Sequence, residues 1–320
     1  MYDNPTLRDI FEARSLLKNY LLRTPLHHYP SLSTMLGAEV YVKHENHTPI
    51  GSFKIRGGLN AVAKLNEEQR NKGIIVTSTG NFGQSAAYAG KLFGVKTIVT
   101  MPEKHNPGKA AAIRSFGAEI IPYGVDVDYA REHAESLAAE RGYYYFDDGQ
   151  DRDYTAGLGT CMLEILEDLP DAEVVIIPIG GGGLSSSSCI AAKNINPNLT
   201  IIGVSLAQAP SPYLSWKAGK LVEAPMESTV DGIAVRISFE ITQRVLRKHL
   251  DDYLVVTDEE IRKSVLLMLE KTHNLSEGAG AAPLAAAFKI QSQISGRKTV
   301  LIQSGGNISI DHLKENLSSV

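Results

Sequence analysis

Along the chain, short β-branched hydrophobic runs alternate with longer segments of helical periodicity. Several runs are almost wholly apolar, as strands covered by helices on both faces must be. The expected strands are 39–43, 73–78, 97–101, 119–123, 174–179, 200–205, 253–256 and 299–303. The expected helices are near 54–66, 84–94, 108–116, 127–141, 155–168, 184–194, 259–272 and 279–294. This alternation predicts βαβ units, so the expected fold class is α/β with mostly parallel sheets.

The length of 320 residues fits two domains or one large α/β unit. No linker rich in proline, glycine and serine divides the chain, and no internal repeat is present. The aromatic and acidic stretch 143–153 is the best candidate for a boundary, because one strand-helix group precedes it and another follows it.

Charge and cysteine content exclude several classes of protein. The net charge is −4 and is spread without long basic runs, which argues against a nucleic-acid partner. Two cysteines cannot form a disulfide framework and fit a reducing compartment. The start of the chain has no apolar core typical of a secretory signal, and no apolar run approaches the roughly 20 residues of a membrane span. We therefore expect a soluble, cytoplasmic protein with no membrane partner.

The clearest chemical signal is a run of four glycines, Gly180, Gly181, Gly182 and Gly183, between a strand and a serine-rich helix start. Glycines allow close backbone approach, and free amides at a helix start favour a phosphate. A tight turn is the alternative, but four glycines exceed what a turn requires. The run lacks the spacing of a dinucleotide-binding motif and the lysine of a P-loop, so NAD and ATP are disfavoured. A smaller phosphorylated cofactor fits better.

Lys54 lies in the first turn of a predicted helix, within a glycine-flanked segment, 51–58. A helix start is already positive, which disfavours a cation and suits an amine that acts as nucleophile or base. The alternative is an ordinary solvated lysine.

Two further polar segments follow predicted strands. The segment 78–84 offers hydroxyls, an amide side chain and free backbone amides, which together can hold a carboxylate. Its alternative function is to cap the following helix. The segment 304–307, Ser-Gly-Gly-Asn, ends the last strand. Open α/β sheets bind their ligands at such strand ends.

Taken together and in this order, these segments resemble the fold-type-II pyridoxal-phosphate enzymes, in particular the branch of serine/threonine dehydratases and serine racemases. The resemblance extends from Thr24 to Asn307, with the segments 156–157 and 277–280 in their usual places. It implies two open, mostly parallel twisted sheets, as in the tryptophan synthase β-subunit, with the cofactor in the cleft between domains. The implied domains are a large cofactor-binding domain, 1–60 with 146–320, and a small substrate-carboxylate-binding domain, 61–145. A homodimer is also implied.

The resemblance assigns roles to individual residues. Lys54, beside Phe53, would hold pyridoxal 5'-phosphate as a Schiff base. The four glycines with Leu184 would bind its phosphate, Asn81 would contact the ring hydroxyl, and Ser304 would contact the ring nitrogen. The residues assigned to the substrate carboxylate are Ser78, Thr79, Asn81, Phe82 and Gln84.

The implied activity is loss of water from a β-hydroxy amino acid, giving a 2-oxo acid and ammonia, with Lys54 removing the α-proton. A serine at the ring nitrogen favours this elimination over transamination. The alternatives are a racemase that uses Lys54 and Thr79 on opposite faces, and a β-replacement enzyme, which the Ser-Phe-Lys-x-Arg-Gly pattern disfavours. A non-catalytic binding protein is disfavoured by Lys54, Asn81 and Ser304 together. Serine, threonine, 3-hydroxyaspartate and aryl-serines all remain open as substrates.

Four features depart from the family pattern. Thr79 stands where racemases have a serine, and Phe82 stands where the family has a histidine. Ser205 and Ser211 stand where metal-activated relatives have Glu and Asp, so we expect no divalent metal there. The chain ends shortly after Asn307, so we expect no regulatory domain of the kind found in biosynthetic threonine dehydratases.

Overall fold

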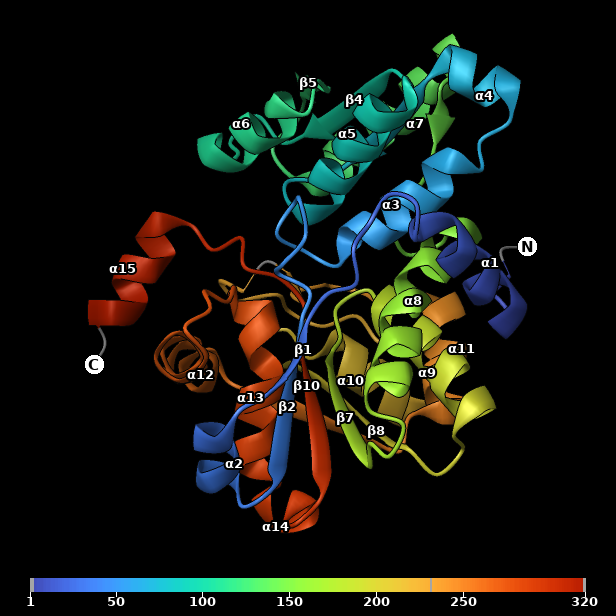
Figure 1. Cartoon of the computed structure of the whole chain (residues 1–320). Helices are drawn as coiled ribbons and strands as arrows, with labels where there is room; N and C mark the ends of the chain where they lie inside the picture. The colour runs from blue at the N-terminus through green and yellow to red at the C-terminus, as the bar shows by residue number, and fades with distance from the viewer. Residues whose placement is uncertain (1–2, 231, 319–320) are drawn as a thin grey trace.

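Two sheets organise this computed structural model, which describes residues 3–230 and 232–318, and they lie one above the other in Figure 1. The lower sheet has the strand order β1 (Leu26–His28), β2 (Glu39–His44), β10 (Lys298–Gln303), β7 (Val174–Pro178), β8 (Thr200–Leu206), β9 (Asp252–Val256). The upper sheet has the order β5 (Glu119–Pro122), β4 (Thr97–Met101), β3 (Ile74–Thr77), β6 (Tyr144–Tyr145). Neighbouring strands are parallel except β1, which is antiparallel to β2.

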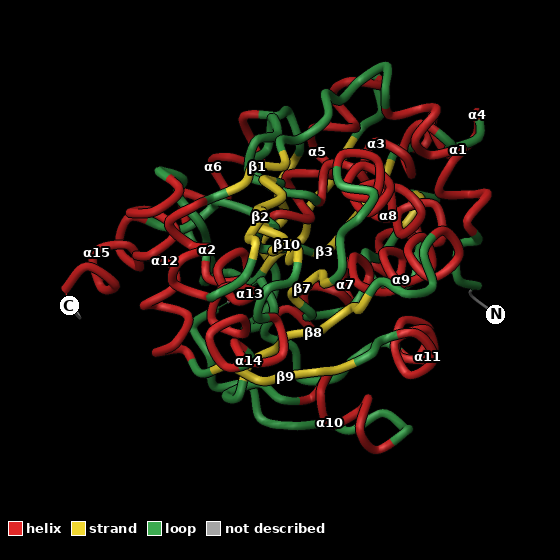
Figure 2. The backbone as a smooth tube through the Cα atoms, turned by 60° about the horizontal axis from the view of Figure 1, so that its bottom comes forward, coloured by secondary structure: helices red, strands yellow, loops and turns green. Residues whose placement is uncertain are grey.

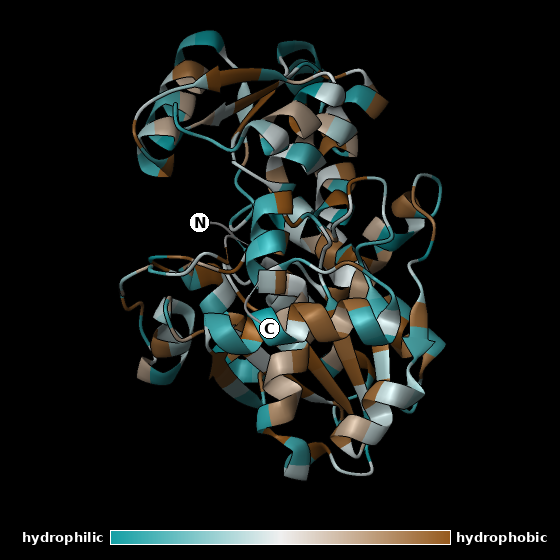
Figure 3. Cartoon of the chain, turned by 90° about the vertical axis from the view of Figure 1, so that its left-hand side faces the viewer, coloured by the Kyte–Doolittle hydropathy of each residue, from teal (hydrophilic) through white to brown (hydrophobic). Residues whose placement is uncertain are grey.

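Helices cover both faces of the lower sheet. Alternate residues of β7 face opposite clusters: Val175 and Ile177 pack on the side of α8 (Arg152–Asp168) and α9 (Gly183–Ile195), and the residues between them pack on the side of α13 (Gly278–Lys289). Figure 2 shows these helices in red on either side of the yellow strands. In Figure 3 the enclosed strands are mostly brown, whereas hydrophilic colours are concentrated on the helices around them. Coverage of both faces explains why β7 is apolar along its whole length.

The remaining helices complete the layers and the connections. They are α1 (Leu7–Leu17), α2 (Pro30–Leu36), α3 (Lys54–Ala63), α4 (Glu67–Lys72), α5 (Asn81–Phe93), α6 (Pro107–Ser115), α7 (Val127–Arg141), α10 (Ser211–Ala218), α11 (Glu240–His249), α12 (Asp258–Thr272), α14 (Gln291–Ile294) and α15 (Ile310–Ser318). None of the helices in the described part of the chain has the length and apolar character needed to cross a membrane.

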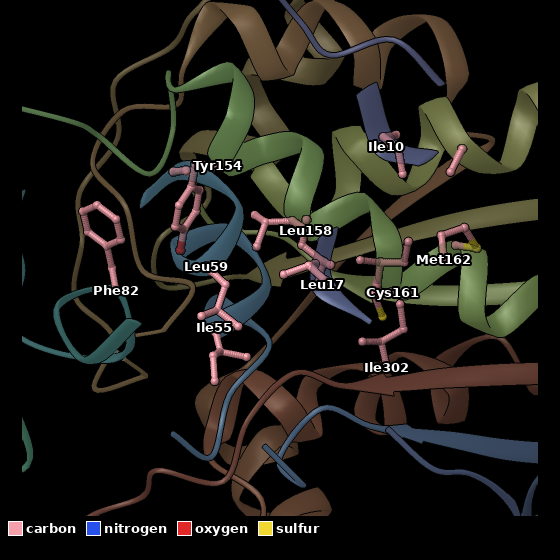
Figure 4. Close-up of a cluster of buried hydrophobic side chains, with 14 of the residues drawn as sticks. Ile10, Leu17, Ile55, Leu59, Phe82, Tyr154, Leu158, Cys161, Met162 and Ile302 are labelled. Carbon is pink, nitrogen blue, oxygen red and sulfur yellow. The ribbon is translucent and has the colours of Figure 1, made fainter. Parts of the chain in front are cut away.

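One hydrophobic cluster connects the two sheets through α3 and α8. It contains Val76 of the upper sheet and Ile302 of the lower sheet, and side chains of both helices lie between them. Figure 4 shows part of this cluster, with Ile55 and Leu59 of α3 close to Tyr154 of α8. The start of α3, which carries Lys54, is therefore anchored in a continuous core.

The predicted α/β class with mostly parallel sheets is confirmed, and the predicted strands and helices lie within a few residues of those observed. The predicted helix 279–294 is wrong as a single element, because the backbone leaves helical geometry at Ile290 and divides it into α13 and α14. Strands β1 and β6 were not predicted, since they are only three and two residues long. Helices α1, α2, α4, α10, α11 and α15 were also missed.

Candidate active site

A cavity of about 450 Å³ lies where the segments after β3, β7 and β10 meet the start of α3. Its wall includes Phe53, Lys54, Ser78, Thr79, Asn81, Phe82, Gly180, Gly181, Gly182, Gly183, Leu184 and Ser304. Parallel strands place their carboxyl ends at one edge of a sheet, which is where open α/β folds bind ligands. Polar segments far apart in the sequence are thus brought to one cavity.

Lys54 is the first residue of α3, and its ammonium nitrogen contacts the carboxylate of Asp148. The nitrogen also lies 5.5 to 5.9 Å from the ring centroids of Phe53, Phe82 and Tyr154. The Ser85 hydroxyl donates to the Lys54 carbonyl at 2.7 Å, which fixes the backbone of this turn. The sequence predicted that the helix start disfavours a cation at Lys54. In the structure, the Asp148 carboxylate compensates the charge of the Lys54 ammonium. Asp148 comes from the stretch 143–153, for which the sequence predicted a domain boundary but no chemical role.

The glycine run forms the turn between β7 and α9. Gly182 has a φ of 90°, and a Cβ at Gly180 would lie 2.9 Å from Ile233 Cα, so both positions require glycine. The first hydrogen bond of α9 runs from Ser186 N to Gly182 O, so the preceding amides are those that a helix leaves for an outside acceptor. The Thr242 hydroxyl holds this turn by donating to Gly181 O at 2.8 Å. These features fit a bound phosphate group.

Asn81 begins α5, and its side chain is held from two sides. Its Nδ2 donates to Glu277 Oε1 at 2.9 Å, and its Oδ1 accepts from Asn307 Nδ2 at 2.7 Å. Asn307 Nδ2 is also 2.8 Å from the carbonyl of Ile50, just before the turn that carries Lys54. Glu277 and Asn307 belong to motifs recognised from sequence, but their contacts with Asn81 were not predicted.

Ser304 follows β10 and is almost fully buried in the cavity wall. Its carbonyl accepts from Phe53 N at 3.0 Å, so the serine is tied to the turn that carries Lys54. The hydroxyl of Ser78 accepts from Gly80 N at 3.1 Å and shapes the turn after β3. Thr79 and Phe82 line the cavity beside it.

Gln84 is not placed in the cavity wall, in contrast to the other residues assigned to the substrate. It lies within α5, where it is buried, and its amide donates to Gly80 O as part of the helix. Its assignment to the substrate carboxylate stays a prediction.

A buried ionic cluster lies beneath the Lys54 turn. Arg56 donates to Glu45 at 2.7 and 2.8 Å and to both carboxylate oxygens of Glu164 at 2.8 Å, and Lys43 donates to Glu164 at 2.7 Å. Burial disfavours the ionised form of Glu164, but Arg56 and Lys43 outweigh it and lower its pKa to about 2. The carboxylate is therefore ionised, and the cluster fixes α3 against α8 and β2.

Ser205 and Ser211 are both buried, and the Ser211 hydroxyl donates to Val222 O at 2.8 Å. Within the described part of the chain, no group of three or more His, Cys, Asp or Glu side chains is arranged to hold a metal ion. The expectation that no divalent metal is needed stays a prediction.

Comparison with known proteins identifies the family. Residues 17–305 match the family described as pyridoxal-phosphate dependent enzyme. The chain is 39% identical over 307 residues to an L-threonine ammonia-lyase of Thermotoga maritima, covering 96% of this chain and 76% of that protein.

Two solved structures extend the comparison. The processed form of threonine deaminase isoform 2 from Solanum lycopersicum has a TM-score of 0.93 and 30% identity, covering 99% of this chain and 91% of that one. Maize serine racemase has a TM-score of 0.92 and 30% identity, covering 98% and 97%. The predicted resemblance and fold class are confirmed: the chain belongs to the pyridoxal-phosphate-dependent enzymes of fold type II, in the branch of serine/threonine dehydratases and serine racemases.

Proposed function

We propose that this protein is a pyridoxal-phosphate-dependent ammonia-lyase that removes water from a β-hydroxy amino acid and releases a 2-oxo acid and ammonia. The observation that carries the proposal is one cavity whose wall combines the amine of Lys54, the polar turn 78–82 and the glycine turn 180–183. The names of the threonine ammonia-lyase and threonine deaminase relatives support the same reaction.

The residues of the cavity fit pyridoxal 5'-phosphate, the cofactor that the family implies. The glycine turn with the Leu184 amide would take its phosphate, Lys54 its aldehyde, and Asn81 and Ser304 the polar edges of its ring, with Phe53 beside it. When bound, this cofactor supplies an electron sink for the Cα of an amino acid. The fit rests on the amides at the start of α9 and on the glycine turn before it, which lines the cavity.

The chain itself supplies orientation and proton transfer. Ser78, Thr79 and the amides at the start of α5 would hold the substrate carboxylate, because they line the same cavity as Lys54. The Lys54 amine would take the α-proton as a general base. The rings of Phe82 and Tyr154, in edge-to-face contact at 5.2 Å, form an apolar wall beside Lys54 that limits the access of water.

A racemase is the second candidate, and the position of Thr79 favours it. Thr79 lies in the wall of the cavity that contains Lys54, and the maize serine racemase has nearly the same fold. In that reaction, Lys54 and Thr79 would exchange the α-proton on opposite faces of the substrate.

The first experiment measures 2-oxo acid release from serine, threonine, 3-hydroxyaspartate and an aryl-serine, with chiral analysis of the remaining substrate. We expect stoichiometric oxo acid and ammonia from one preferred substrate. A scrambled enantiomer ratio with little oxo acid would replace the lyase with the racemase, and Thr79→Ala should then abolish scrambling. Neither product from any substrate would contradict both functions.

The family resemblance also supports proposals about assembly and cellular location. The protein would act as a homodimer in the cytoplasm, without a divalent metal. Both cysteines are free and buried, as expected of a reducing compartment. Light scattering would test the dimer, and unchanged activity after chelation by EDTA would support independence from metal. The proposed domain division, 1–60 with 146–320 and 61–145, is supported by the upper sheet, whose strands all come from 74–145.

A further inference from the structure

Asp148 is the carboxylate in direct contact with the Lys54 amine. The two residues are 94 positions apart, yet both line the cavity. Their side chains are partly exposed, 29% for Asp148 and 20% for Lys54, so both can reach a bound molecule. A Cβ at Gly183 would lie 3.3 Å from the Asp148 carbonyl oxygen, so Asp148 lies between Lys54 and the glycine turn.

Among the described residues, Asp258, Glu277 and Glu315 are the other acidic residues that line the cavity, and partners of the first two are observed. Glu277 accepts from Asn81, and Asp258 accepts from the Ser228 hydroxyl at 2.8 Å. Asp148, in contrast, contacts the group that takes the α-proton. A proton on Lys54 can therefore pass to Asp148 without any rearrangement of the chain.

The neighbour of Asp148 shows that negative charge is crowded at this point. Asp147 is partly buried in the same turn, and its carboxylate accepts from Gly149 N at 2.8 Å. Burial and the charge of Asp148 raise the pKa of Asp147 to about 6, although Arg131 and Lys54 act against the shift. Asp147 and Asp148 therefore bring two carboxyl groups to one turn beside the Lys54 amine.

We propose that Asp148 is a catalytic acid, which gives its proton to the hydroxyl group that leaves the substrate. This inference rests on the proposed dehydration. Hydroxide leaves poorly and water leaves readily, so the reaction needs an acid at this point. General acid catalysis by a positioned side chain contributes about 10²- to 10⁴-fold in rate.

The protons and electrons balance within the Lys54–Asp148 pair. The Lys54 amine takes the α-proton, and the electrons of the C–H bond form the Cα–Cβ double bond while the Cβ–O bond breaks. The oxygen leaves as water with the proton of the Asp148 carboxyl group. The step thus leaves the ammonium–carboxylate pair that the structure shows, and return of the proton from Lys54 to Asp148 restores the neutral amine and the protonated carboxyl group with which the step begins.

The test compares two leaving groups in the holoenzyme, because chloride leaves without a proton and hydroxide does not. For Asp148→Asn we expect about a 10²- to 10⁴-fold loss of kcat with the preferred β-hydroxy amino acid. With the matching β-chloro amino acid we expect less than about a tenfold loss, since no leaving-group acid is required. Asp153→Asn is the matched control: Asp153 pairs with Lys64 on the surface, and both activities should stay near wild type.

Cofactor binding and melting temperature are measured for each variant, so that a structural defect is recognised independently of turnover. Equal losses with both leaving groups in a folded, cofactor-loaded Asp148→Asn enzyme would overturn the role of Asp148. If that variant does not fold or bind cofactor, Asp148→Glu gives the answer: its hydroxide-to-chloride ratio should lie near that of wild type, and a ratio lowered 100-fold would overturn the role. A wild type that eliminates chloride but no hydroxyl group would overturn the proposed dehydration itself.

Discussion

Two cations, Lys54 and Arg56, stand two residues apart in the first turn of α3 and have opposite surroundings. Arg56 is 1% exposed, and Glu45, Glu164, Thr24 and Thr160 all accept its hydrogen bonds.

Lys54, in contrast, is partly exposed in the cavity and has a single carboxylate partner, Asp148. A buried guanidinium with all donors paired is held in one geometry, whereas an amine with one partner beside a cavity can move. Arg56 therefore supplies the rigid base on which a reactive side chain can be positioned.

The largest expected effect is on turnover, and it comes from removing the Lys54 amine. Lys54→Ala should lower kcat by at least about 10²- to 10⁴-fold, because the general base is lost. It should leave the melting temperature of the apoprotein nearly unchanged, since Lys54 does not belong to the buried cluster. Rates and thermal unfolding of the purified variant are the measurements. Full activity would refute the assignment of Lys54.

Removing the Arg56 guanidinium should instead lower the free energy of unfolding. Arg56→Met leaves Glu45 and Glu164 buried without their main partner, and breaking such a pair costs about 3–5 kcal/mol. Arg8→Ala is the control, because Arg8 pairs with Glu12 on the surface and contributes at most about 1 kcal/mol. Urea unfolding compares the two variants. A loss below about 1 kcal/mol in Arg56→Met would contradict the view that the cluster anchors α3.

Acid should weaken the buried cluster through Glu164. Its folded-state pKa, about 2, lies below its ordinary value of 4.5, so its stabilisation is present above about pH 4.5 and is lost as pH falls towards about 2. Glu164→Gln should therefore be less stable at neutral pH and show a shallower decline in melting temperature on acidification. If the melting temperatures of wild type and Glu164→Gln fell equally with pH, Glu164 would not be the origin of the acid sensitivity.

The smallest effect is expected at Thr24, at the edge of the cluster. Its hydroxyl donates to Glu45 at 2.5 Å and accepts from Arg56 at 3.1 Å. Thr24→Val preserves the shape and should cost about 1–3 kcal/mol, because charged groups lose a buried partner. Thermal unfolding should show reduced stability of Thr24→Val, whereas its kcat should stay nearly unchanged. A change confined to turnover would instead link Thr24 to the chemistry.

The sequence predicted much of the site, since Lys54, Thr79, Asn81, the four glycines and Ser304 all line one cavity. These residues belong to local motifs at strand ends, where residue type and backbone geometry are closely linked. Gln84 is not among the residues that line this cavity, because motif position does not say which way a helical residue faces. Helix α11 was missed although its apolar positions follow a helical pattern, and α1 was missed although Thr6 and Asp9 form a capping box at its start.

By itself, the sequence determined the α/β class, the positions of the major strands along the chain and the motif residues, because hydrophobic periodicity and glycine placement are local properties. Only the tertiary structure decided which charges meet. Asp148 joins Lys54 across 94 positions, Glu164 joins Arg56 across 108, and Glu277 joins Asn81 across 196. Hydrophobic periodicity does not predict such pairs, because strand order and helix packing bring the two residues together. The distinction between a reactive cation and a fixed one therefore depends on the folded protein.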